Sequence, residues 1–320
     1  MRLYFDTNIY DFISDKQEAQ IVHNFLDANG FEVQASSTNV METYAISDKE
    51  KCKQQLKTLS TVATSLEAKP QSWWQAKELL SEIKRVNPYW LRQPASHKLI
   101  LEEKNSLKGH LSVWERVINL YIPSQFATSA FRKDFESGVA KSTFSQKTLR
   151  QRLLKNELDL RLNFQSKDGK ITELSEGKYL EPDLFWRVDC LLAWFEAIVR
   201  RAPESRDYAD WLLPYVRENA FRAPTYVDFW INRVKSEKVP KNRIASLVGF
   251  YQMKQKVTHG NPNDQMHSCH ALDVEVFITA DMAFFKTLEA TAAHFTKIAK
   301  VILLDRSAAS PLDQLKMTLL

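Results

Sequence analysis

The β-type sequence of this 320-residue chain lies at its two ends, and this distribution limits the possible folds more than any other feature. Four short apolar runs predict strands: Arg2–Phe5 (RLYF), Phe31–Ser36, Val274–Thr279 (VEVFIT) and Lys300–Leu304 (KVILL). Helical spacing marks the segments that alternate with them: Gln17–Asn29, residues 38–48, Asp264–Leu272 and Met282–Ala293. This alternation predicts an α/β domain with a parallel sheet.

Residues 50–240 have long helical periodicities and no comparable β-type run. The simplest architecture is one α/β domain that is built from both ends of the chain and interrupted by a large all-helical insertion. We therefore predict that residues 1–48 and 241–320 form the two parts of the α/β domain, and that residues 49–240 form the insertion.

Composition excludes several classes of protein. Hydrophobic residues make up 44% and charged residues 26%, as in a globular protein that folds in water. No run of about 18 apolar residues is present, and Asp6 interrupts the segment where a signal peptide needs an apolar core, so we expect no membrane association and a cytoplasmic location. The three cysteines show no CxxC spacing, which predicts free buried thiols.

Acidic residues follow the predicted strands at positions where a ligand crevice is expected. Asp6 and Asp281 fall at the carboxyl ends of two predicted strands, which meet at one edge of a parallel sheet. Glu42 and Asp264 fall in the first turns of the neighbouring helices and can face the same edge. The sequence thus predicts that four carboxylates converge.

Such a group needs a cation, because two carboxylates about 5 Å apart repel each other by roughly 3 kcal/mol at an effective dielectric constant near 20. Hard oxygen ligands favour Mg²⁺ or Mn²⁺ over zinc. Ions of this kind activate water and neutralise the charge that develops on a phosphodiester under attack. The net charge of +5 is a mild additional indication of a polyanionic partner.

Three local strings resemble the PIN-domain nucleases, a family of metal-dependent ribonucleases: YFDTNIY at 4–10, SSTNVMETYA at 36–45, and ND…ALDVEVFITAD at 263–281. The resemblance covers residues 1–48 and about 245–305. It implies a doubly wound α/β/α sandwich, cleavage of RNA, and acidic site positions at Asp6, Glu42, Asp264 and Asp281. It also implies supporting roles for Asn8 and Thr279.

The resemblance leaves the physiological role open between a toxin of a toxin–antitoxin pair, an RNA-processing enzyme and an anti-phage effector. It implies an RNA substrate, and it allows an antitoxin or other regulatory protein and a homodimer as partners. Two other functions also fit the sequence. One is a nuclease that acts on single-stranded or flap DNA, and the other is a non-catalytic RNA-binding scaffold.

Each acid also has a purely structural interpretation. Asp6 with Thr7 and Asn8 fits a polar turn, and Glu42 fits the second half of a capping box with Asn39. Asp264 fits an ordinary first-turn helix acid, Asp281 fits a helix N-cap, and Asp273 fits the loop before a strand.

Two further groups of residues have alternative interpretations. His267 lies one helical turn after Asp264 and is a candidate zinc ligand, although a structural or supporting histidine fits better because zinc needs about four ligands. The segment 141–155 carries basic residues without an acid. Lys147, Arg150 and Arg152 could follow a phosphate backbone, or they could form a solvated helix face.

Overall fold

The computed structural model describes residues 1–122, 181–201, 206–222, 224–255 and 261–320, together with the single positions Lys133, Ser137 and Ala140. The chain divides into two compact units. The sheet unit consists of residues Met1–Pro70, Gly109–Thr143 and Thr258–Leu320, and the helical unit consists of Gln71–Lys108 and Phe144–Val257. Within the described residues, no helix combines the length and the apolar character needed to cross a membrane.

The sheet unit is an α/β fold in which strands and helices alternate along the chain. Its elements are β1 (Arg2–Phe5), α1 (Thr7–Asp15), α2 (Ala19–Ala28), β2 (Glu32–Ser36), α3 (Ser37–Ala45), α4 (Lys49–Val62), β3 (Ser65–Glu67), α7 (Val113–Ile118), α13 (Asn261–Ser268), β4 (Val276–Thr279), α14 (Met282–Ala292), β5 (Lys300–Leu303) and α15 (Pro311–Leu319).

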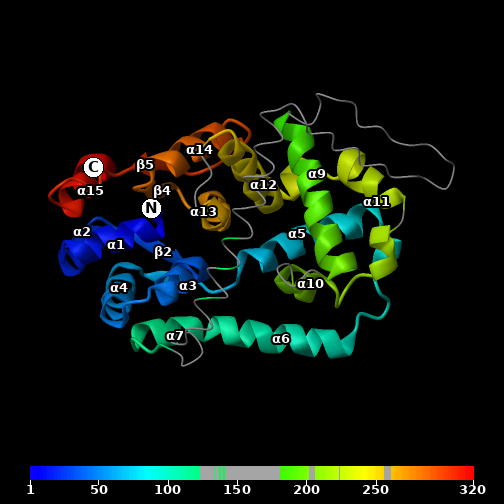
Figure 1. The fold of residues 1–320 in the computed structure, drawn as a ribbon, viewed down its shortest axis with the longest axis horizontal. Helices are drawn as coiled ribbons and strands as arrows, with labels where there is room; N and C mark the ends of the chain where they lie inside the picture. Colours follow the sequence, from blue (N-terminus) through cyan, green and yellow to red (C-terminus); the bar gives the residue numbers. More distant parts are fainter. Residues whose placement is uncertain are drawn as a thin grey trace. The chain divides into compact units, whose positions relative to one another are not determined.

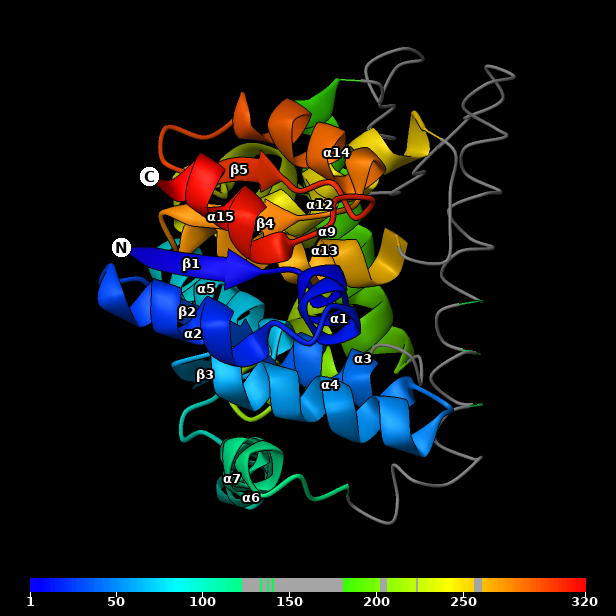
Figure 2. The ribbon, with the colours of Figure 1, turned by 90° about the vertical axis from the view of Figure 1, so that its left-hand side faces the viewer.

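All strand pairs of the five-stranded sheet are parallel, and the strand order is β3-β2-β1-β4-β5. Figure 2 shows the strands in this order, from β5 at the top to β3 at the bottom. The first three strands of the chain extend the sheet in one direction from β1, and the last two extend it in the other. The order therefore reverses between β1 and β4, which is where parallel sheets of this type open a ligand crevice.

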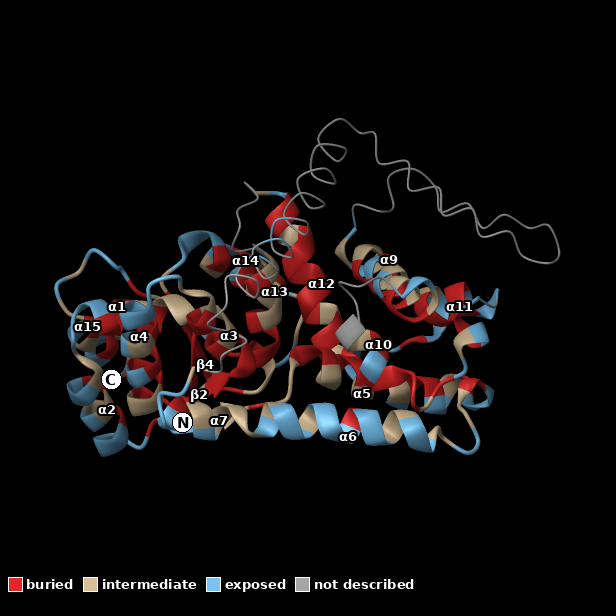
Figure 3. Cartoon of the chain, turned by 60° about the horizontal axis from the view of Figure 1, so that its bottom comes forward, coloured by how far each residue is buried: buried red, intermediate tan, exposed pale blue. Residues whose placement is uncertain are grey.

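Helices cover both faces of the sheet. On one face, Leu3 and Phe5 of β1 join a buried core with residues of α1 to α4 and α15. On the other face, the ring of Tyr4 stacks on that of His270, and Phe277 packs edge-on against Phe284 of α14. This alternation follows from the strand geometry, in which successive side chains point to opposite faces. Figure 3 shows that β4, between β1 and β5, is buried.

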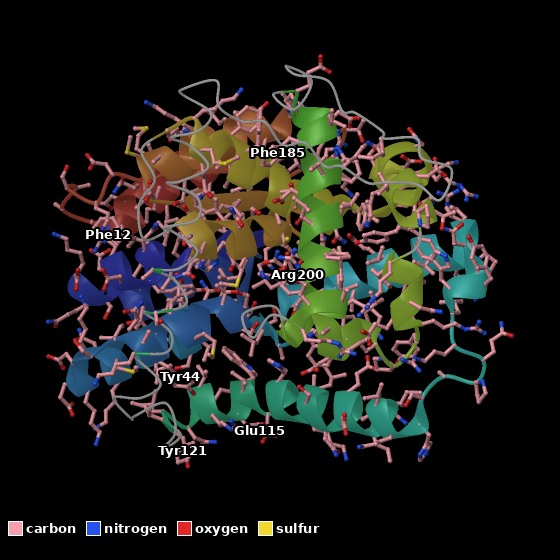
Figure 4. All side chains as sticks on the ribbon, turned by 45° about the vertical axis from the view of Figure 1, so that its right-hand side comes forward. Phe12, Tyr44, Glu115, Tyr121, Phe185 and Arg200 are labelled. Atoms are coloured by element: carbon pink, nitrogen blue, oxygen red, sulfur yellow. The ribbon has the colours of Figure 1, made fainter. Side chains whose placement is uncertain are left out.

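The sheet unit also includes the segment around α7. Val117 of α7 belongs to the buried core of this unit. The hydroxyl group of Tyr44 on α3 donates a hydrogen bond to the carbonyl oxygen of Tyr121, at 3.2 Å (Figure 4). These contacts tie residues of the chain's middle section to the domain that is built from its ends.

In its described residues, the helical unit contains α5 (Gln71–Val86), α9 (Pro182–Phe195), α10 (Arg206–Leu212), α11 (Thr225–Asp228) and α12 (Pro240–Met253) (Figure 1). The division between the units falls within α6 (His97–Leu111). Helix α12 packs against α5 and α9. The buried indole group of Trp194 in this unit donates its N–H to Asn242 Oδ1 at 3.0 Å.

The structure confirms the α/β class and the parallel sheet, and several of its elements differ from the sequence expectation. Residues Thr7–Asp15 form a helix that the sequence analysis did not predict. Strand β3 lies within the stretch that was predicted to be helical. The sequence did not indicate this strand, because three residues are too few to show an alternation of apolar and polar side chains. The predicted helix Asp264–Leu272 begins earlier, at Asn261, and ends as a tight 3-10 turn at Cys269–Leu272. The three cysteines are buried thiols that form no disulfide, as predicted.

Candidate metal centre

Asp6 marks the point where β1 ends and α1 begins. Its backbone N–H donates to the carbonyl oxygen of Ile278 at 2.9 Å, which continues the pairing of β1 with β4. Its carboxylate Oδ1 accepts the N–H of Thr7 at 2.7 Å, and Asp6 is therefore the N-cap of α1. The residue is only 6% exposed. The polar turn of the structural interpretation is thus the first turn of a helix at the reversal point of the sheet.

The other oxygen of Asp6 is held by the two residues for which supporting roles were predicted. Thr279, the last residue of β4, donates its hydroxyl group to Asp6 Oδ2 at 2.7 Å. Asn8 donates its side-chain N–H to the same oxygen at 2.5 Å and accepts the backbone N–H of Ala280 at 2.9 Å. These bonds fix the carboxylate between the ends of β1 and β4.

Glu42 lies on α3 and is free of the capping role considered for it. The capping box of α3 is formed by Ser36 and Asn39, so the alternative interpretation of Glu42 as part of a box with Asn39 is wrong. The helix begins at Ser37, two residues before Asn39, which places Glu42 beyond the first turn. The Glu42 carboxylate accepts hydrogen bonds from the hydroxyl group of Thr7 and from Asn263 Nδ2, the latter at 2.6 Å.

His267 of α13 completes the group. Its Nε2 lies 2.8 Å from Glu42 Oε2 and 3.7 Å from Asp6 Oδ1, and its side chain is 1% exposed. One ligand atom each from Asp6, Glu42 and His267 lie within 4.8 Å of one another. In the described part of the chain, this is the one group of at least three acidic, histidine or cysteine side chains with such spacing.

The three groups shift one another's pKa values. Burial raises the pKa of Asp6 and outweighs the opposing charge of His267. Burial would also raise the pKa of Glu42. The charge and the hydrogen bond of His267, together with the hydrogen bonds from Thr7 and Asn263, outweigh this effect and lower the pKa. Burial would lower the pKa of His267, but Glu42 and Asp6 raise it overall. Without a metal, these shifts favour the ionised form of Glu42 and the protonated form of His267.

A second observation, at Asn263, supports a bound cation at this group of side chains. Asn263 is 8% exposed, and its Nδ2 is occupied by Glu42. Its Oδ1 is buried and has no hydrogen-bond partner among the described residues. A buried carbonyl oxygen without a donor is costly unless a cation or water satisfies it. Two carboxylates, an imidazole and an amide oxygen are all ligands of divalent metals.

The other two predicted acids lie near this group but outside it. Asp264 follows Asn263 on α13 and is partly buried. Asp281 is exposed, and its Oδ1 caps α14 by accepting the N–H groups of Ala283 and Phe284 at 2.7 and 3.0 Å. Its backbone N–H donates to Thr279 Oγ1 at 3.1 Å, which links it to Asp6 through Thr279. The ligand roles of Asp264 and Asp281 stay predictions, and Asp273 lies in the loop before β4.

The sequence analysis missed Thr7 and Asn263, and it treated His267 as a side alternative. A signal was present for two of them, because Asn263 and His267 are four residues apart and therefore share one face of a helix. No local pattern could show that this helix face meets Glu42, which is 225 residues from His267 in the sequence.

The predicted basic residues and the comparisons with known proteins do not identify a function. The basic residues Lys147, Arg150 and Arg152 lie outside the described residues. The chain matches no protein-family model, no curated protein and no solved structure.

Proposed function

We propose that this chain is a metal-dependent nuclease that hydrolyses phosphodiester bonds of RNA at the centre formed by Asp6, Glu42 and His267. The observation that carries the proposal is the convergence of two carboxylates and an imidazole at the reversal point of a parallel sheet. The proposed ion is Mg²⁺ or Mn²⁺, and when bound it would activate water and neutralise charge on the scissile phosphate.

The residues around the centre support this function by holding both carboxylates in place. Asp6 Oδ2 accepts from Thr279 and Asn8, and Glu42 accepts from Thr7 and Asn263. Hydrogen bonds to a carboxylate favour its ionised form, which is the form that binds a cation. Fixed ligand orientation also lowers the cost of assembling the site when metal and substrate bind.

The resemblance to the PIN-domain nucleases supports RNA as the substrate and a PIN-like sheet unit. In this proposal Asp264 and Asp281 complete the acidic set, acting on substrate or water from positions beside the three central residues. Asp281 Oδ1 caps α14, and its second oxygen accepts no hydrogen bond from the described residues. An antitoxin or other regulatory protein, and a second copy of the chain, are proposed partners on the same resemblance.

The test is cleavage of labelled RNA and labelled DNA by the full chain and by Glu42→Gln, with Mg²⁺ or Mn²⁺ and with a chelator. We expect wild-type protein to cleave RNA only when metal is present, and we expect Glu42→Gln to lose at least about a hundredfold in rate, since metal stabilisation of the transition state is worth several kcal/mol. The matched control is Glu82→Gln, which removes the charge of a buried acid in the helical unit.

The possible results separate the competing functions. Cleavage of DNA but not RNA would identify a DNA nuclease at the same centre. RNA binding without cleavage under any metal would support the non-catalytic scaffold. Metal-independent cleavage, or equal cleavage by Glu42→Gln, would refute the proposed centre.

A further inference from the structure

The second ring nitrogen of His267 belongs to a buried chain of hydrogen bonds that the proposed reaction does not use. His267 Nδ1 lies 2.6 Å from the hydroxyl oxygen of Tyr4, which lies 2.7 Å from Ser36 Oγ. Ser36 Oγ in turn donates to Asn39 Oδ1 at 3.0 Å. Tyr4 is fully buried, and its ring is stacked on that of His270 with the centroids 4.6 Å apart. The hydroxyl group thus has little freedom to choose other partners.

Asn39 sets the direction of this chain. Its Oδ1 accepts the backbone N–H of Ser36 at 2.8 Å, and a backbone N–H cannot act as an acceptor. Its Nδ2 donates to the carbonyl oxygen of Phe5 at 3.2 Å and to Thr7 Oγ1 at 3.1 Å. The orientation of the Asn39 amide is therefore fixed by the Ser36 N–H group and the Phe5 carbonyl oxygen, each of which has only one possible role.

From this fixed end the protons can be assigned one after another. The Ser36 hydroxyl group donates to Asn39 Oδ1, so the Tyr4 hydroxyl group donates to Ser36 Oγ, and the Tyr4 oxygen accepts the N–H at His267 Nδ1. This arrangement is the same whether Nε2 carries a proton or a cation. With the proton held at Nδ1, a neutral His267 presents the lone pair of Nε2 toward Asp6 and Glu42.

We propose that Tyr4 positions His267 as a nitrogen ligand of the centre, and that this ligand makes the centre select Mn²⁺ over Mg²⁺. The inference rests on the proposed metal centre. Mg²⁺ prefers oxygen ligands and keeps most of its water, whereas imidazole suits the first-row transition metals, whose affinities rise from Mn²⁺ toward Cu²⁺. Asp6 and Glu42 alone would supply an all-oxygen site, and His267 changes its preference.

The first test measures Mn²⁺ and Mg²⁺ affinities of the full chain by titration calorimetry. We expect wild-type protein to bind Mn²⁺ at least roughly tenfold more tightly than Mg²⁺. Tyr4→Phe keeps the ring on His270 and removes the hydroxyl group, and it should lower Mn²⁺ affinity by roughly 10- to 100-fold, with a smaller change for Mg²⁺. His267→Gln, with an oxygen donor of similar reach, should abolish the preference for Mn²⁺.

The matched control is Tyr10→Phe. Tyr10 is also fully buried in the sheet unit, and its hydroxyl group has no hydrogen-bond partner among the described residues. This variant removes the same atom without touching His267, and it should leave both affinities unchanged.

A second measurement needs no variant. In wild-type protein with ¹⁵N-labelled histidine, addition of diamagnetic Zn²⁺ should shift the resonance of His267 Nε2 and leave Nδ1 protonated. A metal shift at Nδ1, or a proton-free Nδ1 in the bound state, would overturn the proposed role of Tyr4 even if Tyr4→Phe failed to fold.

The outcomes also separate this inference from the proposed function. Equal affinities for Mn²⁺ and Mg²⁺ in wild-type protein, or parallel losses of both in Tyr4→Phe, would overturn the inference and leave metal-dependent cleavage intact. Selective Mn²⁺ binding that depends on His267 and Tyr4, without RNA cleavage, would support the inference and refute the nuclease. A chain that binds neither metal would refute both.

Discussion

The sheet unit and the helical unit both bury acidic side chains, but they balance them differently. Among the described residues of the helical unit, the two buried acids each have their own donors. Glu82 is 1% exposed and receives two N–H groups of Arg85, at 2.8 and 2.5 Å. Glu103 is 7% exposed and pairs with Lys77 Nζ at 2.8 Å and with the hydroxyl group of Tyr215. The negative charge of each of these two acids is balanced by its own basic side chain, without a ligand.

At the strand ends of the sheet unit, two acids share one basic partner. Asp6 and Glu42 both face Nε2 of His267, and their remaining hydrogen bonds come from neutral donors. A single imidazolium balances at most one of the two negative charges. Burial of an acid is therefore no sign of a metal centre by itself, whereas a shared and insufficient counter-charge is.

The largest effect that tests this comparison is expected from Asp6→Asn. Cleavage should fall by two or more orders of magnitude because a metal ligand is lost, while the melting temperature should hold because one of two neighbouring anions is removed. Glu82→Gln should do the opposite. It should lose about 2 kcal/mol of stability, the usual contribution of hydrogen bonds to a charged group, and keep full activity per folded molecule.

Paired measurements of cleavage rate and thermal unfolding check this contrast. If Asp6→Asn destabilised the fold as much as Glu82→Gln does and cleaved RNA at the wild-type rate, the two kinds of buried acid would be equivalent.

The second-largest expected effect is on stability and concerns Glu78 of α5, whose side chain caps helix α12. Its carboxylate accepts the N–H groups of Lys241 and Asn242 at 3.0 and 3.2 Å, at the start of α12, whose own N-cap residue Val239 provides no side-chain hydrogen bond. Burial raises the pKa of Glu78 from 4.5 to about 7, against the opposing effect of these hydrogen bonds. Glu78 is thus held by helix N–H groups, and its carboxyl group titrates near neutral pH.

This raised pKa predicts a pH dependence with a definite sign. The folded state holds a proton on Glu78 that the unfolded state has lost, so stability should fall as the pH rises from 4.5 to about 7 and then level off. The loss amounts to up to about 3 kcal/mol. Glu78→Gln should remove this component, and denaturant unfolding across the pH range would show it as a difference between the two profiles.

The smallest stability effect is expected from two helix caps of the sheet unit. Asp281 caps α14, and Asp48 caps α4 by accepting the N–H groups of Glu50 and Lys51 at 2.9 and 3.0 Å. Serine also caps helices, so Asp281→Ser and Asp48→Ser should each cost less than about 1 kcal/mol. Only Asp281→Ser should reduce cleavage, if Asp281 belongs to the acidic set. Equal activity of the two variants would assign Asp281 to capping alone.

The sequence by itself determined the local parts of this protein. Strand β1 was predicted at Arg2–Phe5. The alternation of side chains along a strand already places Leu3 and Phe5 on the opposite side from Tyr4 and Asp6. The position of Asp6 at the end of this strand followed from the same run, as did that of Thr279 at the end of β4. These features depend on residues within a few positions of one another, because the side-chain periodicity and the residues that end a strand are local signals.

Only the tertiary structure decided which of these parts meet. The pairing of β1 with β4 brings Thr279 to Asp6 across 273 residues of sequence, and the packing of α13 brings His267 to Glu42 across 225. The sequence also left open a cap formed by Asn39 and Glu42, because it could not show that Ser36 occupies the N-cap position. Strand order and helix packing arise from the burial of whole faces, which many residues determine jointly, so no local spacing encodes the partner of a single carboxylate.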